Sequence, residues 1–222
     1  MGQTISLTAK DGFKLGAYRA DPDGKPRGTI VVIQEIFGVN HHIRSVADRY
    51  AALGYVAIAP QVFDRAQKDF ETGYDQPSME AGRGMRGKIS TENLLLDTQA
   101  AVDFGKQFGK VAVIGYCMGG SVAFLSATRL DGVACAVGYY GGQIAQSCDE
   151  KPRVPTMLHF GDQDQSIPMT DVEKIKKARP ETPCFVYHAG HGFHCDERAS
   201  FAPEAAQVAA CRSQEFLAKH VG

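Results

Sequence analysis

The chain has 222 residues, which is enough for one sizeable domain with a buried core, and we expect residues 1–222 to form a single domain. Its 24 basic and 25 acidic residues give a formal net charge of −1, and no long basic run is present. This balance argues against binding to nucleic acid or to an anionic membrane. No segment is apolar enough to span a bilayer, and Met1 to Lys10 lacks the apolar block of a signal peptide, so we expect a cytoplasmic location.

The six cysteines are scattered singly, without a C-x-x-C pair. In a cytoplasmic chain of this size, such cysteines are expected to be reduced, with one of them reactive. The sequence does not specify an oligomeric state, and a monomer is compatible with it.

The first half of the chain is predicted to form a hairpin followed by alternating strands and helices. Asp11-Gly12 is a typical hairpin turn. Asn40 can cap a helix that ends near Gly54, because the apolar residues between them follow helical spacing. The strands expected here are Ile5–Ala9, Phe13–Arg19, Thr29–Ile33 and Tyr55–Ala59.

From Gln61 to about Ser90 the sequence is polar, and we expect an irregular excursion over the sheet. Beyond it, strands and helices alternate again, and Pro203 suits the first turn of a final helix to about Lys219. This alternation predicts an α/β fold: a mostly parallel sheet with helices on both faces, preceded by an antiparallel hairpin. The helices expected are Leu94–Phe108, Ser121–Leu130 and Met169–Ala178, and the strands are Val111–Tyr116, Val133–Tyr139, Thr156–Phe160 and Cys184–His188.

The most informative motif is Gly115-Tyr116-Cys117-Met118-Gly119-Gly120, which follows an apolar strand and precedes a helical segment. This is the setting of a nucleophile elbow, with cysteine where the commoner pattern has serine. Glycines are needed there because helix and strand approach closely, and the strained turn exposes the nucleophile at the positive end of a helix. A single cysteine is more often a small buried hydrophobe, but this context favours a nucleophile.

Three further candidates follow the ends of predicted strands, where ligands gather in open α/β sheets. They are Glu35, Asp164 and His191. Cys117, Asp164 and His191 occur in the order nucleophile, acid, histidine, which is the order in α/β hydrolases. The alternatives are that Asp164 closes an Asx turn and that Glu35 is a solvated charge at a strand end.

Two other patterns are weaker. Residues 82–87 spell G-x-G-x-x-G, but no strand precedes them and Ile89 stands where a phosphate loop needs Ser or Thr, so a nucleotide site is not expected. His191, His194 and Cys195 lack the second ligand pair of a zinc site, so no metal and no cofactor is predicted. His194 and the pair His41-His42 are expected to be exposed or structural.

These motifs together resemble the dienelactone hydrolase (carboxymethylenebutenolidase) family of α/β hydrolases. The resemblance covers nearly the whole chain, through Q-E-I-F-G-V-N at 34–40, G-Y-C-M-G-G at 115–120, G-Y-Y-G at 138–141, Asp164 with Ile167-Pro168, and A-G-H at 189–191. It implies an α/β-hydrolase fold and hydrolysis of a small lactone or ester through a thioester.

The resemblance also implies a role for each site residue. Cys117, Asp164 and His191 would form the triad, and Glu35 would hold the cysteine as a neutral thiol and then take its proton. The backbone N–H groups of Met118 and Ile36 would receive the oxyanion.

The resemblance also suggests which residues contact the substrate. Phe37, Tyr139 and Tyr140 would form walls, although aromatic residues there could equally be core. Family members acting on dienelactone hold its carboxylate with arginines. One of these lies four residues after the histidine, where this chain has Cys195, and Arg198 is a candidate replacement. The other falls in the excursion, where the candidates are Arg83 and Arg86.

Two alternatives to a lactone hydrolase stay open on the sequence. One is a general carboxylesterase or thioesterase on the same scaffold. The other is a thiol-based redox sensor that keeps the fold without catalysis, because a fold alone does not establish activity.

Overall fold

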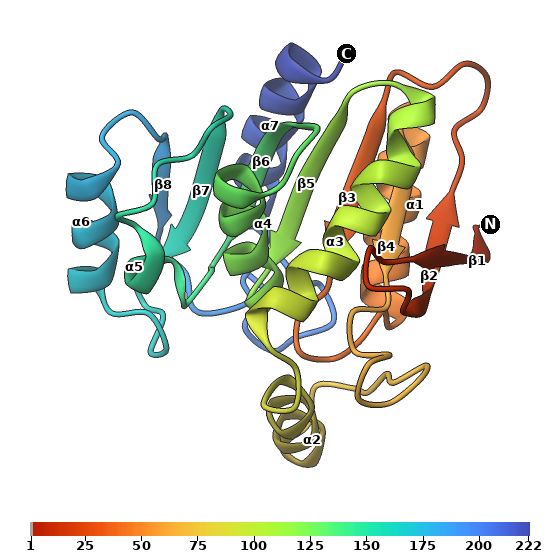
Figure 1. The fold of residues 1–222 in the computed structure, drawn as a ribbon. Helices are drawn as coiled ribbons and strands as arrows, with labels where there is room; N and C mark the ends of the chain where they lie inside the picture. The colour runs from red at the N-terminus through yellow and green to blue at the C-terminus, as the bar shows by residue number, and fades with distance from the viewer. Residues whose placement is uncertain (1) are drawn as a thin grey trace.

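One eight-stranded sheet organises the chain, and most of it is parallel (Figure 1). The computed structural model describes residues 2–222 and orders the strands β1-β2-β4-β3-β5-β6-β7-β8. β1 pairs with β2, and β2 with β4, in antiparallel fashion, whereas all other neighbouring strands run parallel. The strands are β1 (Gln3–Thr8), β2 (Lys14–Ala20), β3 (Thr29–Ile33), β4 (Val56–Pro60), β5 (Val111–Tyr116), β6 (Val133–Tyr139), β7 (Thr156–Gly161) and β8 (Cys184–Tyr187).

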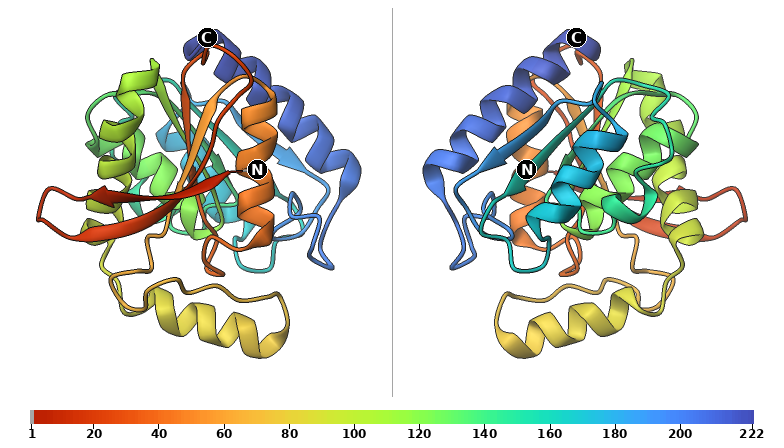
Figure 2. Two further views of the ribbon diagram at one scale, coloured as in Figure 1. Left: turned by 90° about the vertical axis from the view of Figure 1, so that its right-hand side faces the viewer. Right: turned by 90° about the vertical axis from the view of Figure 1, so that its left-hand side faces the viewer.

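Helices cover both faces of this sheet (Figure 2). α1 and α7 lie on one face, and α3, α4 and α6 lie on the other. None of the helices within residues 2–222 is both long and apolar enough to cross a membrane. The helices are α1 (His41–Ala52), α2 (Gln76–Arg86), α3 (Thr91–Gly105), the short 3₁₀ turn η1 (Lys106–Phe108), α4 (Met118–Arg129), α5 (Ile144–Ser147), α6 (Met169–Ala178) and α7 (Pro203–His220).

The predicted α/β class and the N-terminal antiparallel hairpin are therefore confirmed. Every residue of the central strands β3 and β5 is buried, because helices pack on both of their faces. The expected helix bounds differ only at the ends. α3 begins at Thr91 after its Ser90 cap, and the segment that follows Gly105 tightens into η1. α4 begins at Met118, directly after Cys117.

The excursion between β4 and α3 is not irregular throughout, because it contains the eleven-residue helix α2. Asp75 caps this helix by accepting a hydrogen bond from the Ser78 N–H at 2.9 Å, and Pro77 occupies its first turn. Three glycines within or at the end of the helix lower its helix propensity, and for this reason the sequence pattern did not predict it. Figure 1 shows α2 beyond the carboxyl ends of the strands, beneath the body of the sheet.

Arg65 anchors the excursion to the rest of the protein. Its guanidinium donates to the Asp97 carboxylate at 2.7 Å and to the Asp11 carboxylate at 2.7 Å. Asp97 lies on α3 and is fully buried, whereas Asp11 is in the turn of the hairpin. One side chain therefore ties the start of the excursion to two distant elements.

α2 rests on the segment after β3 through Gly82. A Cβ atom at Gly82 would lie 2.4 Å from the Ile36 carbonyl oxygen, a distance that real Cβ contacts do not reach. Gly84, one half-turn along the same helix, would place its Cβ in open space. Both glycines lower the stability of the helix relative to alanine, but only Gly82 is in contact with another segment.

We expect Gly82→Ala to weaken the packing of α2 against the segment after β3. Gly84→Ala should instead stabilise the helix by up to about 1 kcal/mol. The reason is that the methyl group at position 82 collides with backbone, while at position 84 only the gain in helix propensity remains. Hydrogen exchange of the amides of residues 76–86 measures both effects. Equal protection in the two variants would contradict this packing.

Candidate active site

Cys117 sits at the turn between β5 and α4 and has a left-handed backbone conformation, with φ of 55°. A non-glycine residue there stores about 1–3 kcal/mol of strain, which the surrounding structure must offset. The Cys117 N–H donates to the Tyr139 carbonyl at 3.0 Å, so the neighbouring strand β6 holds the turn. The residue is partly exposed and lies at the N-terminal end of a twelve-residue helix.

The glycines around Cys117 are required by backbone contacts. A Cβ at Gly115 would lie 1.9 Å from the Gly119 carbonyl oxygen, and a Cβ at Gly119 would lie 2.3 Å from that of Ile33. At Gly120 it would lie 2.3 Å from the Tyr139 carbonyl oxygen. α4 thus crosses β3, β5 and β6 at a separation that no side chain permits.

His191 and Asp164 lie beside this turn, as their positions after β8 and β7 predict. The Cys117 Sγ and His191 Nε2 are 3.1 Å apart, and His191 Nδ1 is 2.7 Å from Asp164 Oδ2. The other oxygen of Asp164 accepts from the N–H groups of Ser166 at 2.8 Å and Ile167 at 3.2 Å. The carboxylate is therefore fixed by its own loop and orients the imidazole.

The thiol and the carboxylate both act on the charge of His191. Burial alone lowers the pKa of His191, but the negative charge of the Cys117 thiolate and the hydrogen bond to Asp164 outweigh it and raise the pKa to about 10. The imidazolium is thus the favoured partner of an ionised sulfur at neutral pH.

Glu35 is almost completely buried, with 1% of its surface exposed, and it forms an ion pair with Arg198. Arg198 Nη1 donates to Glu35 Oε1 at 3.0 Å, whereas Oε2 has no protein partner. Burial lowers the pKa of Arg198, but the charges of Glu35 and Cys117 outweigh it and raise that pKa above its ordinary value. Arg198 therefore interacts electrostatically with both the Glu35 carboxylate and the Cys117 sulfur.

Arg198 reaches this position because its loop bends back over Gly192. A Cβ at Gly192, which has φ of 77°, would lie 2.4 Å from Arg198 Nη1. The guanidinium lies over the Phe37 ring, 5.5 Å from its centroid, and over the Tyr74 ring at 6.0 Å. Such cation–π contacts add to the ion pair and hold the arginine in place.

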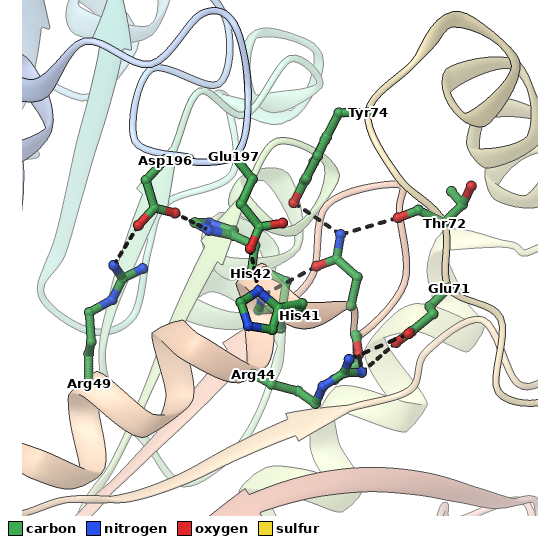
Figure 3. Close-up of polar contacts among 12 residues, drawn as sticks. His41, His42, Arg44, Arg49, Glu71, Thr72, Tyr74, Asp196 and Glu197 are labelled. Carbon is green, nitrogen blue, oxygen red and sulfur yellow. Dashed lines mark hydrogen bonds and ion pairs between the residues drawn. The ribbon is translucent and has the colours of Figure 1, made fainter.

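The loop that carries His191 and Arg198 is also tied to the first turns of α1. Figure 3 shows His42 beside Asp196 and His41 beside Glu197. His42 Nδ1 is 2.9 Å from Asp196 Oδ1, and His41 Nδ1 is 2.5 Å from Glu197 Oε1. His42 is fully buried, so its expected structural role is confirmed, whereas His41 is exposed.

Cys117, His191 and Arg198 line a pocket of about 560 Å³, and α2 supplies another part of its wall. Of the expected residues, Cys117, His191, Met118, Ile36, Phe37, Arg83, Arg86 and Arg198 all contribute to its wall. The pocket also includes Gly190 of the A-G-H motif, and residues that the sequence did not single out: Met79, Ser121, Gly142, Gln143, Gln163, Gln165, Ser166 and Ser200.

The residues that sequence reasoning missed come mainly from α2 and from short loops after strands. Met79 belongs to the unpredicted helix, and Gln143 follows β6 in a loop without a motif. Gln163 and Gln165 flank Asp164. Their proximity to a predicted acid at a strand end was the one available signal.

Arg86 is the better placed of the two arginines on α2. Its Nη1 donates to the Ile89 carbonyl at 2.7 Å, and its Nη2 lies 3.3 Å from Gln143 Oε1. Burial lowers the pKa of Arg86, because desolvation disfavours its charge. A half-buried cation of this kind is suited to an anionic group.

Tyr139 and Tyr140 do not line this pocket, so of the two interpretations left open by the sequence, the place in the core is the one that the structure supports. Both side chains are fully buried, and the Tyr139 hydroxyl is 2.7 Å from Ser213 Oγ on α7. Tyr140 packs edge-on against His191, with ring centroids 5.1 Å apart. The tyrosines belong to the core behind the histidine rather than to a surface that a ligand could touch.

The glycine pattern at 82–87 lies in and at the end of α2 and follows no strand, so the geometry of a dinucleotide loop is not present. Within residues 2–222, one group of three side chains has donor atoms near enough to share a metal ion: His42, Asp196 and Glu197. It does not include His191 or Cys195.

Comparison with known proteins gives consistent results. A sequence profile of the dienelactone hydrolase family matches residues 15–221. A carboxymethylenebutenolidase of Pseudomonas putida is 32% identical and aligns over 96% of this chain and 95% of that protein. A Synechocystis protein named as a candidate carboxymethylenebutenolidase is 36% identical, over 91% of both chains. A Klebsiella pneumoniae structure, a candidate dienelactone hydrolase, is 26% identical, covers 99% of both chains and gives a TM-score of 0.86.

Removing Arg198 should leave the buried Glu35 carboxylate without a counter-charge. We expect Arg198→Gln to lower the free energy of unfolding by about 3 kcal/mol, because breaking a buried pair leaves one charge desolvated. Arg129→Gln is the matched control, since its ion pair with Glu150 joins side chains that are 40% and 37% exposed, and it should cost under about 1 kcal/mol. Urea denaturation measures both, and equal losses would contradict the importance of the buried pair.

Proposed function

Because the chain belongs to the dienelactone hydrolase family and is a hydrolase of that type, we propose that it cleaves a small lactone or carboxylic ester through Cys117. The observation that carries the proposal is the continuous chain of contacts from Cys117 Sγ through His191 to Asp164, at 3.1 and 2.7 Å. This is the geometry in which an imidazole, oriented by a carboxylate, activates a nucleophile. It adjoins a pocket large enough for a small ester.

In the first step, the Cys117 thiolate attacks the carbonyl carbon of the ester. The C–S bond forms, and the electron pair of the carbonyl moves onto oxygen. The N–H of Met118, at the first position of α4, has no acceptor within the helix and is available to this oxyanion, with the N–H of Ile36 as second donor. Each such donor is typically worth ~10²–10³-fold in rate. Collapse expels the alkoxide or enolate, which takes a proton from His191, and leaves a thioester on Cys117.

In the second step, water attacks the thioester. Neutral His191 Nε2 removes a proton from the water, and Asp164 stabilises the imidazolium that results. The tetrahedral intermediate then releases the carboxylic acid and regenerates the sulfur. For a lactone, the ring opens in the first step, so one molecule carries both the new carboxylate and the former leaving group.

Glu35 is proposed to control the ionisation of the thiol. Its carboxylate disfavours a standing thiolate nearby, whereas the His191 imidazolium favours it. Arg198 neutralises part of the carboxylate charge through their ion pair. The fraction of reactive thiolate is therefore set by the balance of these three groups.

For the substrate, we propose a small molecule with an apolar body and one carboxylate. Ile36, Phe37, Met79 and Met118 supply the apolar walls, and Arg86 supplies the cation on the side of α2. Arg198 is already occupied by Glu35, which leaves Arg86 as the better carboxylate contact.

We propose further that residues 1–222 act as one catalytic unit in the cytoplasm, without a cofactor. The cysteines Cys117, Cys135, Cys148, Cys184, Cys195 and Cys211 are all free thiols, which suits a reducing compartment.

Replacing the sulfur tests the proposal most directly. We expect Cys117→Ala to lower kcat for a dienelactone or an activated aryl ester at least ~10³-fold, because the covalent step is lost. The thermal unfolding midpoint should stay close to that of the unmodified protein. Cys211→Ala, at an exposed thiol outside the pocket, is the control and should leave kcat within about twofold. Undiminished turnover by Cys117→Ala would refute the proposal.

The charges around the sulfur predict an order of reactivity towards iodoacetamide. At pH 6, His191→Ala should slow alkylation of Cys117 by ~tenfold or more, because the imidazolium that stabilises the thiolate is removed. Glu35→Gln should accelerate it, because an opposing charge is removed. The effect of His191→Ala should fade as pH rises through the His191 pKa of about 10, where the imidazolium is lost.

Mass spectrometry of tryptic peptides reports Cys117 and Cys211 in the same digest, and exposed Cys211 serves as the internal reference for an ordinary thiol. A Cys117 rate that is unchanged by both substitutions would show that neither group controls the sulfur.

A further inference from the structure

Arg86 is a half-buried cation in the wall of the pocket that contains Cys117. Burial lowers its pKa, and within residues 2–222 no neighbouring carboxylate acts to raise it. Arg198 lines the same pocket but already pairs with Glu35 at 3.0 Å. The charge of Arg86 is therefore left for an anionic ligand to neutralise. The acceptors that surround its guanidinium are uncharged: the Ile89 carbonyl oxygen, Thr91 Oγ1 and Gln143 Oε1.

Gln143 meets this guanidinium from the loop after β6. Its Oε1 lies 3.3 Å from Arg86 Nη2. A guanidinium has only donors, so the amide oxygen is the atom that faces it, and this assigns the amide nitrogen to the other side of the group. Within the described residues 2–222, the Gln143 side chain makes no other hydrogen bond. Both N–H donors on Nε2 are therefore available to a ligand in the pocket.

The backbone of Gln143 is anchored near the proposed nucleophile. Its N–H donates to Ser121 Oγ at 3.0 Å, and Ser121 is buried. Ser121 comes four residues after Cys117 at the start of α4, which corresponds to a rise of about 6 Å along a helix. All three residues line the same pocket. The amide of Gln143 is thus held by the helix that carries the sulfur, about one helical turn along it.

We propose that Gln143 determines the preference of this pocket for anionic esters, an inference that rests on the proposed hydrolysis of a carboxylate-bearing ester. A carboxylate accepts hydrogen bonds at two oxygens. One oxygen accepts from the Arg86 guanidinium, and the other accepts from Gln143 Nε2. Gln143 Oε1 keeps the guanidinium in place at the same time. One side chain therefore positions the cation and supplies a second donor, and a neutral ester gains from neither contact.

The test compares two esters with the same leaving group and a different charge at the far end of the acyl chain. Mono-p-nitrophenyl fumarate has a carboxylate where p-nitrophenyl crotonate has a methyl group, and its trans double bond keeps that carboxylate away from its own ester. Gln143→Ala should raise KM for the fumarate ester ~tenfold or more, because a hydrogen bond to a charged group is lost, and leave kcat within about threefold. Both constants for the crotonate ester should stay within about twofold.

Two further variants make the result specific to Gln143. Gln143→Glu should raise KM for the fumarate ester more than Gln143→Ala does, because the new carboxylate neutralises Arg86 and repels the substrate. Gln146→Ala is the matched control, since Gln146 is exposed and does not line the pocket, and it should change no constant more than about twofold. An equal loss on both esters in Gln143→Ala would show that Gln143 only supports α2, and would overturn the inference.

A binding measurement separates this inference from the proposed function. Cys117→Ala cannot form the thioester, so equilibrium dialysis with this variant gives the dissociation constant of the intact fumarate ester. Adding Gln143→Ala should raise that constant ~tenfold or more. An unchanged constant, or no binding by Cys117→Ala, would overturn the role of Gln143 even where the unmodified protein hydrolyses both esters through Cys117. Failure of the unmodified protein to hydrolyse either ester would instead count against the proposed function.

Discussion

The close approach of polypeptide backbones at the turn between β5 and α4 is the constraint on which the site depends. Carbonyl oxygens of Ile33, Gly119 and Tyr139 occupy the space where side chains of Gly115, Gly119 and Gly120 would stand. Because three strands and one helix meet there without side chains between them, the position of Cys117 is set by backbone. Close backbone packing therefore fixes the position of the proposed nucleophile. The energetic cost of its strained backbone conformation is offset by the contacts of the surrounding sheet.

The buried pair of Glu35 and Arg198 joins two segments that are far apart in sequence. Glu35 follows β3, and Arg198 lies on the loop between β8 and α7, which also carries His191. The same loop is bonded to α1 through His42 and Asp196. The loop between β8 and α7 thus carries both the cation that pairs with Glu35 and the residue that holds the histidine loop against α1. A substitution that disturbs one of these contacts is expected to affect the other.

Sequence reasoning succeeded where position along a strand determines position in space. Cys117, Asp164 and His191 follow strand ends, and parallel strands bring those ends to one edge of the sheet. It failed where a side chain's direction depends on tertiary packing. Tyr139 is at such an edge, yet its hydroxyl turns to Ser213 on α7. α2 escaped prediction because glycines weakened its pattern, although its seat on Ile36 needs one of them.

The contact between Gly82 and Ile36 means that the roof of the pocket and one proposed oxyanion donor are parts of the same packed unit. In the proposed mechanism, an ester bulky enough to displace α2 would also remove the packing of Gly82 against the Ile36 carbonyl. Discrimination by size would then operate on turnover as well as on affinity. An oversized substrate would then meet a poorly organised site for the developing negative charge, and the proposed mechanism makes pocket size and the rate of bond cleavage depend on the same contact.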